Sequence, residues 1–372
     1  MCVENTRAAL LSRTSFLAAA GAAAAPLLMG ASARAATAPA LPAVPSGLSQ
    51  GNRHAAQIAR ESPFIRTQYA GVHMLVNSIG DAALRAKALD LLENPVPKYA
   101  LKYRSTQSRT ALRDALAREG FVKADAPVSG IFPAGTGSGG VVQPFWSAPG
   151  SALDSHHSYP GGLLVHEFFN ATMAANFERT YDAVYFGGRP QVNRDVAIAA
   201  ALYHDIMKTV VFQFNADGSL FPELEIAATG GHHCLSGAEA IARGHDARFV
   251  TVLLSAHAAP SLGDEAKVVS WCRAAALIAG VDPVEFGLVK KTSDGYALAT
   301  LPSIESFVNY LSDHDFVLTI PAVREVVPAI AKINSDLWFR HRVLSRASAI
   351  ALYEELLQGE DRLLRAVHAA AQ

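Results

Sequence analysis

The residues best able to do chemistry are histidines, an aspartate and a lysine in the central third of the chain. The chain has 13 histidines, and eight lie there, at positions 156, 157, 166, 204, 232, 233, 245 and 257. Asp205 directly follows His204, and Lys208 comes shortly after it. Imidazole with carboxylate suits Mn, Fe, Zn, Co or Ni rather than Ca or Mg alone. A carboxylate can also bridge two ions, and the water between them becomes a nucleophile at neutral pH.

The segment that carries this aspartate, Asp195–Thr209, is expected to form a buried helix. It consists mostly of Ala, Leu and Ile and has almost no charge after Asp195, and Ala and Leu are strong helix formers. A buried carboxylate without a partner is costly, and a bound metal cation is the commonest relief. A hydrogen-bonded His–Asp pair inside a core is the alternative interpretation.

Three further helices are expected to supply the other histidines. His166 lies within one helical segment, His232 and His233 begin another, and His257 ends a fourth. Ligands that converge from several helices on the core of a bundle are a common way to build a mononuclear or dinuclear metal site. One buried histidine is usually structural, but groups arriving from four helices favour a metal site.

These segments resemble the HD-domain superfamily of metal-dependent phosphohydrolases. HSYPGGLLVH at His157–His166 is similar to the segment around the first metal histidine of that superfamily, and HDIMK at His204–Lys208 is similar to its defining HD motif. Gly231 and His232, followed by LSGAEAI, match a later GH segment, and LLSAHAAP at Leu253–Pro260 matches a further histidine. The resemblance covers less than half of the chain.

The resemblance implies an all-α HD-domain helical bundle that binds one or two divalent transition metal ions, Fe, Mn or Zn. The implied metal ligands are His166, His204 and Asp205, with His232 and His257 completing a second metal site. Lys208 and His157 would face the phosphate, as a cation and as a donor or acid. Asp205 would also take part in catalysis.

One departure from the family pattern concerns the last aspartate of the site. HD domains normally supply it from a helix that corresponds here to VVSWCRAAALIAG, which has Arg273 and alanines instead. We expect either a replacement from another direction or an impaired site, and the candidate replacements are Asp282, Asp294, Asp313 and Asp315. Arg273 is a candidate anion-binding group, although an ion-paired surface residue is the alternative.

The remaining polar residues near the motifs are interpreted as structural. Only one histidine of the doublet His232–His233 need be a ligand, and the preceding glycine favours His232. Glu167 follows a ligand directly and is expected to point away from it around the helix. The histidines assigned to loop or structural positions are His156, His245, His314, His341 and His368.

The chain is expected to begin with a targeting segment and to continue as helices. Residues 1–35 have the charged, apolar and small-residue order of a signal peptide, which predicts a periplasmic or secreted protein with an uncertain export route. A flexible linker at 36–52 is expected to precede helices and a Gly/Pro-rich loop at 53–150. The metal-site core is expected at 151–290, and further packing helices at 291–372. One short hairpin is expected at Thr209–Phe221, around Asp217 and Gly218.

Composition limits the partners. The formal net charge is -1, which gives no electrostatic signal for nucleic acid. The mature chain shows no membrane span, and its oligomeric state stays open. Cys234 and Cys272 could pair or could be two buried thiols.

The main functional prediction is an exported phosphohydrolase that cleaves a phosphomonoester or phosphodiester of a small molecule, with nucleotides as candidates, through a metal-activated water. The first alternative is an HD-type di-iron oxygenase that cleaves a small organic substrate. The second is a degenerate HD domain that acts as a non-enzymatic binding module.

Overall fold

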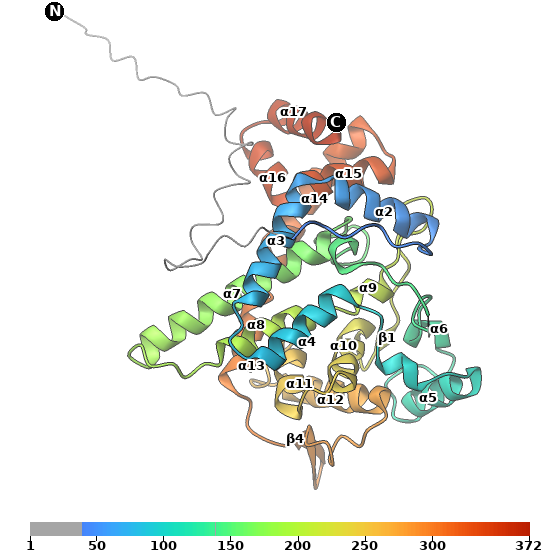
Figure 1. Cartoon of the computed structure of the whole chain (residues 1–372), viewed down its shortest axis with the longest axis vertical. Coiled ribbons are helices and arrows are strands. Elements are labelled where there is room, and N and C mark those ends of the chain that lie inside the picture. Colours follow the sequence, from blue (N-terminus) through green and yellow to red (C-terminus); the bar gives the residue numbers. More distant parts are fainter. Residues whose placement is uncertain (1–38, 138) are drawn as a thin grey trace, which may run out of the picture. The chain divides into compact units, whose positions relative to one another are not determined.

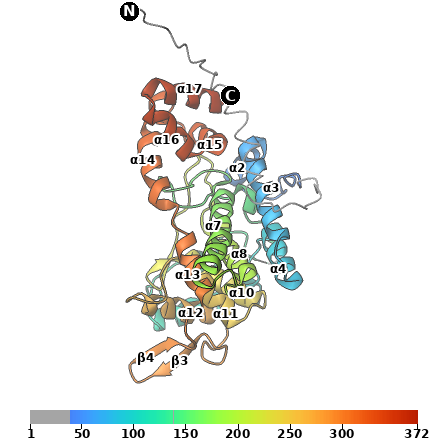
Figure 2. The same cartoon turned by 90° about the vertical axis from the view of Figure 1, so that its left-hand side faces the viewer.

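The computed structural model describes residues 39–137 and 139–372, so the expected signal peptide lies outside the described residues. Residues Pro39–Gln372 form one compact unit, and this unit is all-α apart from two short hairpins (Figures 1 and 2). None of the described helices is long and apolar enough to cross a membrane.

The N-terminal third is helical, as expected. Its longer helices are α2 (Gln50–Glu61), α3 (Pro63–Asn77), α4 (Ala82–Glu93) and α5 (Thr106–Arg118), followed by the short α6 (Val128–Ile131). Ser49, Ser62, Asp81 and Ser105 cap the N-termini of the longer ones through their side chains. The segment assigned to a linker is partly structured, because Leu41 and Leu48 are buried in the core and α2 already starts at Gln50.

The central helices surround the site. They are α7 (Gly162–Tyr185), α8 (Arg194–Tyr203), α9 (Lys208–Val211), α10 (Gly231–Ala242), α11 (Ala247–Leu254) and α12 (Glu265–Ala279). Helix α7 packs against α8, and α10 packs against α12. α8 begins where the side chain of Asn193 accepts a hydrogen bond from Val196 N, and α12 ends at Gly280 in a left-handed conformation.

The C-terminal helices are α13 (Ile304–Ser312), α14 (Phe316–Ile333), α15 (Leu337–Arg346), α16 (Ala349–Leu357) and α17 (Glu360–Ala371). Helix α13 packs on α7 and α8, whereas α15 packs on α2 and α3. Figure 1 shows α14–α17 together at one end of the unit, beside α2.

The hairpins differ from those expected. Thr209–Phe221 contains the end of α9 and then the expected turn around Asp217 and Gly218, which is closed by a single antiparallel bridge between Phe214 and Leu220. The strand pairs are β1 (Glu225–Ile226) with β2 (Thr229–Gly230), and β3 (Val289–Thr292) with β4 (Gly295–Leu298). The start of the segment expected to be C-terminal helices therefore lies in a hairpin, whose short turn is Ser293–Asp294 with Gly295 as the first residue of β4. Both Cys234 and Cys272 are buried free thiols.

Candidate metal centre

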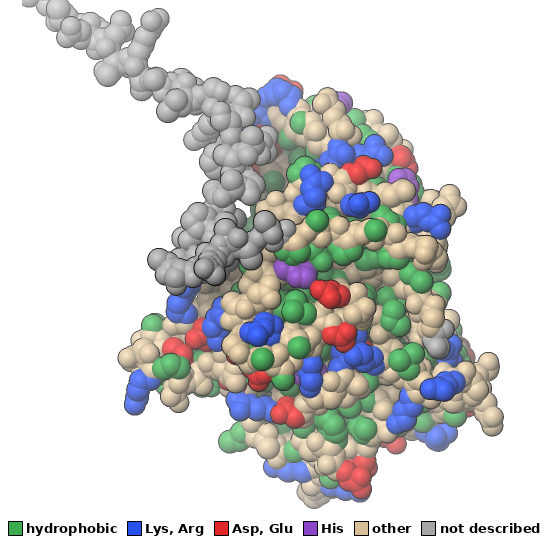
Figure 3. Space-filling view, viewed as in Figure 1, with side chains coloured by type: hydrophobic (Ala, Val, Ile, Leu, Met, Phe, Trp, Pro, Cys, Tyr) green, Lys and Arg blue, Asp and Glu red, His purple; other side chains and the backbone are tan. Residues whose placement is uncertain are grey.

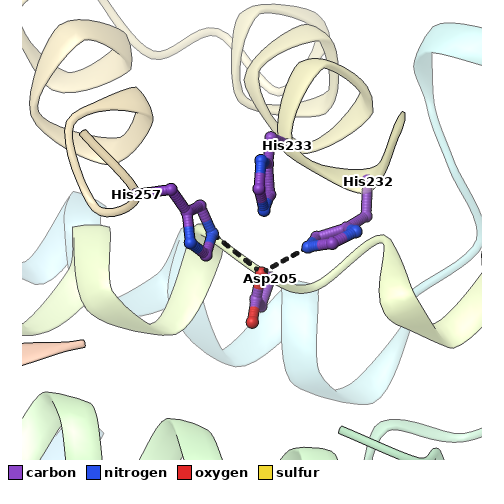
Figure 4. Close-up of side chains that lie close together, drawn as sticks. All are labelled: Asp205, His232, His233 and His257. Carbon is purple, nitrogen blue, oxygen red and sulfur yellow. Dashed lines mark hydrogen bonds and ion pairs between the residues drawn. The ribbon is translucent and has the colours of Figure 1, made fainter. Parts of the chain in front are cut away.

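Asp205 lies between two pairs of histidines. Its Oδ2 is 3.1 Å from Nε2 of His166 and 3.4 Å from Nε2 of His204. Its Oδ1 is 3.0 Å from Nε2 of His232 and 3.2 Å from Nε2 of His257. Figure 4 shows His232 and His257 directed at this carboxylate from two different segments. The fully buried carboxylate thus presents one oxygen to each pair, which is the arrangement needed to bridge two ions.

The end of α8 fixes the first of these pairs. The run of alanines that precedes Leu202 and Tyr203 is completely buried, so the helix carries His204 and Asp205 into the core. Nδ1 of His204 donates to the Ala201 carbonyl at 2.6 Å. This bond leaves Nε2 as the nitrogen available to a metal ion, and Nε2 faces Asp205 and Asp313.

Asp313 completes the first group from another direction. It follows the last residue of α13, and its Oδ1 lies 3.2 Å from Nε2 of His166 and 3.4 Å from Nε2 of His204. The amide of Asn170, one turn after His166 on α7, donates to the same oxygen at 3.0 Å. His166, His204, Asp205 and Asp313 therefore form a group of two imidazoles and two carboxylates, and the second carboxylate comes from α13 instead of the helix with Arg273.

The second group is oriented from behind by Glu223. Its Oε1 accepts from the backbone N of His232 at 2.6 Å and from Nδ1 of the same residue at 2.5 Å. The ring therefore directs Nε2 toward Asp205. His233 is also near, but its Nδ1 shares a hydrogen bond with Thr229 Oγ1, and its ring stacks on His257 at 3.5 Å between centroids.

Asp315 links the first group to the preceding loop. Its Oδ1 lies 3.4 Å from Nδ1 of His166, and its Oδ2 lies 2.6 Å from Nε2 of His157. Nδ1 of His157 is 3.2 Å from the Tyr159 hydroxyl, so both ring nitrogens of His157 are engaged. The half-buried ring of His156 lies 5.3 Å from that of His166. His157 stays the predicted residue facing a phosphate, and His156, which was assigned to a loop position, also lies next to the first group.

Lys208 lies inside the cluster as a counter-ion. Its ammonium contacts Oδ2 of Asp205, and its side chain is almost fully buried. Burial opposes the charge, yet the carboxylates of Asp205 and Asp313 keep the pKa of Lys208 above its usual value. Burial also opposes ionisation of Asp205, but Lys208 and the histidines hold the pKa of this carboxyl well below its usual range. The pair is therefore ionised.

Two further residues that were singled out from the sequence, Glu167 and Arg273, lie on opposite sides of the question: the first is at the cluster and the second is not. Glu167 is buried, and its Oε2 lies 3.3 Å from Nδ1 of His204, so it stands behind a candidate ligand rather than away from the cluster. Arg273 pairs with Glu119 at 2.6 Å and lies over the ring of Tyr296. These contacts are outside the histidine cluster.

The donor set fits a transition metal. Nε2 of His204 and Nε2 of His232 face the carboxylate of Asp205 but form no hydrogen bond of regular geometry within the described part of the chain. Leaving such atoms unpaired is costly, and a cation would satisfy them. The groups His166–His204–Asp313 and Asp205–His232–His233–His257 each hold ligand atoms close enough for one ion. Imidazole and carboxylate together favour Mn, Fe or Zn.

Comparisons with known proteins give one distant relationship. The chain is similar to the dihydroneopterin 2',3'-cyclic phosphate phosphodiesterase of Methanocaldococcus jannaschii, with 27% identity over 145 residues. The match covers 39% of this chain and 42% of the relative, so it spans less than half of either protein. No family model and no solved structure matches the chain.

Proposed function

We propose that the chain is an HD-domain phosphohydrolase that depends on a divalent transition metal and cleaves a phosphomonoester or phosphodiester of a small molecule, with nucleotides as candidates. The observation that carries this proposal is the position of Asp205, whose two oxygens face two separate pairs of histidines. The relative named as a cyclic phosphate phosphodiesterase supports phosphoester chemistry.

Two adjoining metal positions follow from the donor atoms. His166, His204, Asp205 and Asp313 would hold one ion. Asp205, His232 and His257 would hold the other. Ions bound at such positions polarise phosphoryl oxygens and lower the pKa of a bound water.

The residues around the metal positions orient the ligands and balance charge. Glu223 and the Ala201 carbonyl each fix one imidazole, and Asn170 holds Asp313. Lys208 neutralises the buried carboxylates without a metal. With cations bound, its ammonium would be free to pair with a phosphoryl oxygen and offset the charge on the transferred group. His157, anchored to Asp315, or its neighbour His156 would supply a donor to the leaving oxygen.

We also propose that the protein acts outside the cytoplasm. This proposal rests on the order of charged, apolar and small residues in positions 1–35. N-terminal sequencing of the protein recovered from a cell envelope fraction tests it, and a start close to Ala36 is expected. An intact Met1 in the recovered protein contradicts it.

The functional proposal is tested by metal analysis combined with activity assays. The mature chain is purified without chelator and compared with the double variant His204→Ala/Asp205→Ala. We expect about one or two equivalents of Mn, Fe or Zn in the parent, lost in the variant, together with hydrolysis of bis(4-nitrophenyl) phosphate or 4-nitrophenyl phosphate. Metal without hydrolysis but with O₂ consumption would support the oxygenase. Absence of metal in both proteins after reloading contradicts both enzymes.

A further inference from the structure

A cleft of about 410 Å³ adjoins the second histidine group. It lies between α6, α9 and the segment before β1, which are close together in Figure 1. Its walls are mostly apolar and include Val210, Val211, Phe221, Leu224 and Pro133. Phe221 is 50% exposed, so part of its ring is open to solvent at the cleft. An apolar molecule in the cleft would cover this surface.

Glu223 is the one charged residue among those that line this cleft. Its Oε1 is committed to His232, whereas its Oε2 accepts no hydrogen bond within the described part of the chain. The other long polar residue of the lining, Gln213, is already used, because its amide donates to the carbonyls of Ala134 and Val210. The carboxylate of Glu223 is therefore the charged group of the lining, and one of its oxygens accepts no hydrogen bond from the described residues.

We propose that this cleft is a binding site for a small, largely apolar molecule with a cationic or hydrogen-bond-donating group, which pairs with Oε2 of Glu223. The carboxylate repels anions, so the cleft would exclude phosphate. The phosphate position at Lys208 and this site would then differ in charge preference.

Occupation of the cleft reaches the metal centre through one side chain. Glu223 holds His232 by two hydrogen bonds, and Nε2 of His232 faces Asp205 at 3.0 Å. A ligand that draws charge from Oε2 weakens the hold of Oε1 on the imidazole. Partners behind a ligand histidine typically change metal affinity by about 10- to 100-fold when removed. A smaller change in metal affinity is expected when the cleft fills.

The binding test uses three probes of similar size on the full mature chain: benzamidine, benzyl alcohol and benzoate. Calorimetry or ligand-observed NMR measures binding, so the result does not depend on any hydrolytic activity. We expect benzamidine to bind at least tenfold more tightly than benzoate, with benzyl alcohol between them. Glu223→Gln should abolish this preference. Equal binding of benzamidine and benzoate to the parent overturns the proposal.

The location of the binding site is tested by filling the cleft. Ser129 lines the cleft and is exposed, so Ser129→Trp should block benzamidine binding and keep the parent's metal content. Ala134→Trp, at another exposed lining position, serves the same purpose if the first variant does not fold. Ser293→Trp, in the exposed turn between β3 and β4, is the matched control and should bind normally. Undiminished binding to a folded cleft variant places the site elsewhere and contradicts the proposal.

Coupling is measured by titrating metal into the metal-free parent with and without saturating benzamidine. We expect the midpoint for the weaker metal equivalent to shift at least threefold, and no shift in Ser129→Trp. An unchanged midpoint in the parent refutes the coupling.

Discussion

Oδ1 of Asp313 lies 3.2 Å from Nε2 of His166, although the two residues come from distant parts of the sequence. The contact exists because α13 packs along α7 and ends at the site. The second carboxylate of the cluster therefore comes from the end of α13 and not from α12, the helix that carries Arg273. Asp313 thus adds a second carboxylate beside Asp205 to the candidate metal centre.

Asp313→Asn should lower metal affinity by at least about tenfold at the metal position that Asp313 shares with His166 and His204. The amide keeps the shape of the side chain but loses a negative charge and an anionic ligand. Competition with a chromogenic chelator measures the affinity. Asp282→Asn is the control, because Asp282 is exposed and only caps the backbone at Val284 and Glu285. Equal metal affinity in the two variants would rule out Asp313 as a ligand.

His232 and His233 should differ in their effect on the second metal position. Nε2 of His232 faces Asp205 with its opposite nitrogen fixed by Glu223, whereas His233 is held by Thr229 and stacks on His257. His232→Ala should remove about one metal equivalent, and His233→Ala should remove much less. Elemental analysis after dialysis against buffered metal distinguishes them. The reverse order of losses would assign His233 as the ligand.

The motifs predicted the cluster because its members sit next to helix-forming apolar runs. Short-range sequence patterns identify five of its members as candidate ligands: His166, His204, Asp205, His232 and His257. Glu223 has no such sequence signal. It lies in the loop before β1, and only the fold brings it next to His232. Among the four candidate carboxylates, only the packing of α13 on α7 could select Asp313.

The fold class was predictable for a similar local reason. Three-to-four spacing of apolar residues and capping residues such as Ser49 and Asp81 mark α2 and α4 well. Sequence spacing alone does not distinguish the β3–β4 hairpin from a helix, because each strand has only four residues and pairs across the short Ser293–Asp294 turn. Leu41 and Leu48 lie in a Pro-rich segment that looks like a linker, and burial in the core was visible only in three dimensions.

Lys208→Met should destabilise the metal-free protein and make it more responsive to metal. The substitution removes the ammonium that contacts Asp205, and removing one partner of a buried ion pair costs about 3–5 kcal/mol. A bound cation compensates for the lost ammonium. Thermal melts with and without Mn²⁺ or Zn²⁺ should show a lower Tm for the metal-free variant and a larger rise on metal addition than in the parent.

The control for Lys208→Met is Lys332→Met. Lys332 pairs with Glu360 on the surface, with both side chains well exposed, so its loss should change Tm little. A rise on metal addition that is the same in parent and Lys208→Met would show that Lys208 does not stand in for the cation.

Stability should fall in mild acid because of His341. This fully buried residue donates from Nε2 to the Gly218 carbonyl at 2.7 Å. Burial lowers the pKa of His341 to about 4, although the hydrogen bond to that carbonyl acts in the opposite direction. Between about pH 4 and 6.5 the unfolded chain therefore binds a proton that the folded chain does not. The stabilisation is complete above about pH 6.5 and is lost as the pH falls toward 4.

The expected loss from this one group is about 3 kcal/mol between pH 7 and pH 4, at about 1.4 kcal/mol for each unit of pKa shift. Urea unfolding of His341→Gln should show a lower stability at pH 7, because the ring leaves a gap beside Phe214 and Trp338, but a flatter dependence on pH. His368→Gln changes an exposed histidine on α17 and should keep the slope of the parent. A parent-like slope in His341→Gln would mean that other buried groups, such as His245, carry the acid sensitivity.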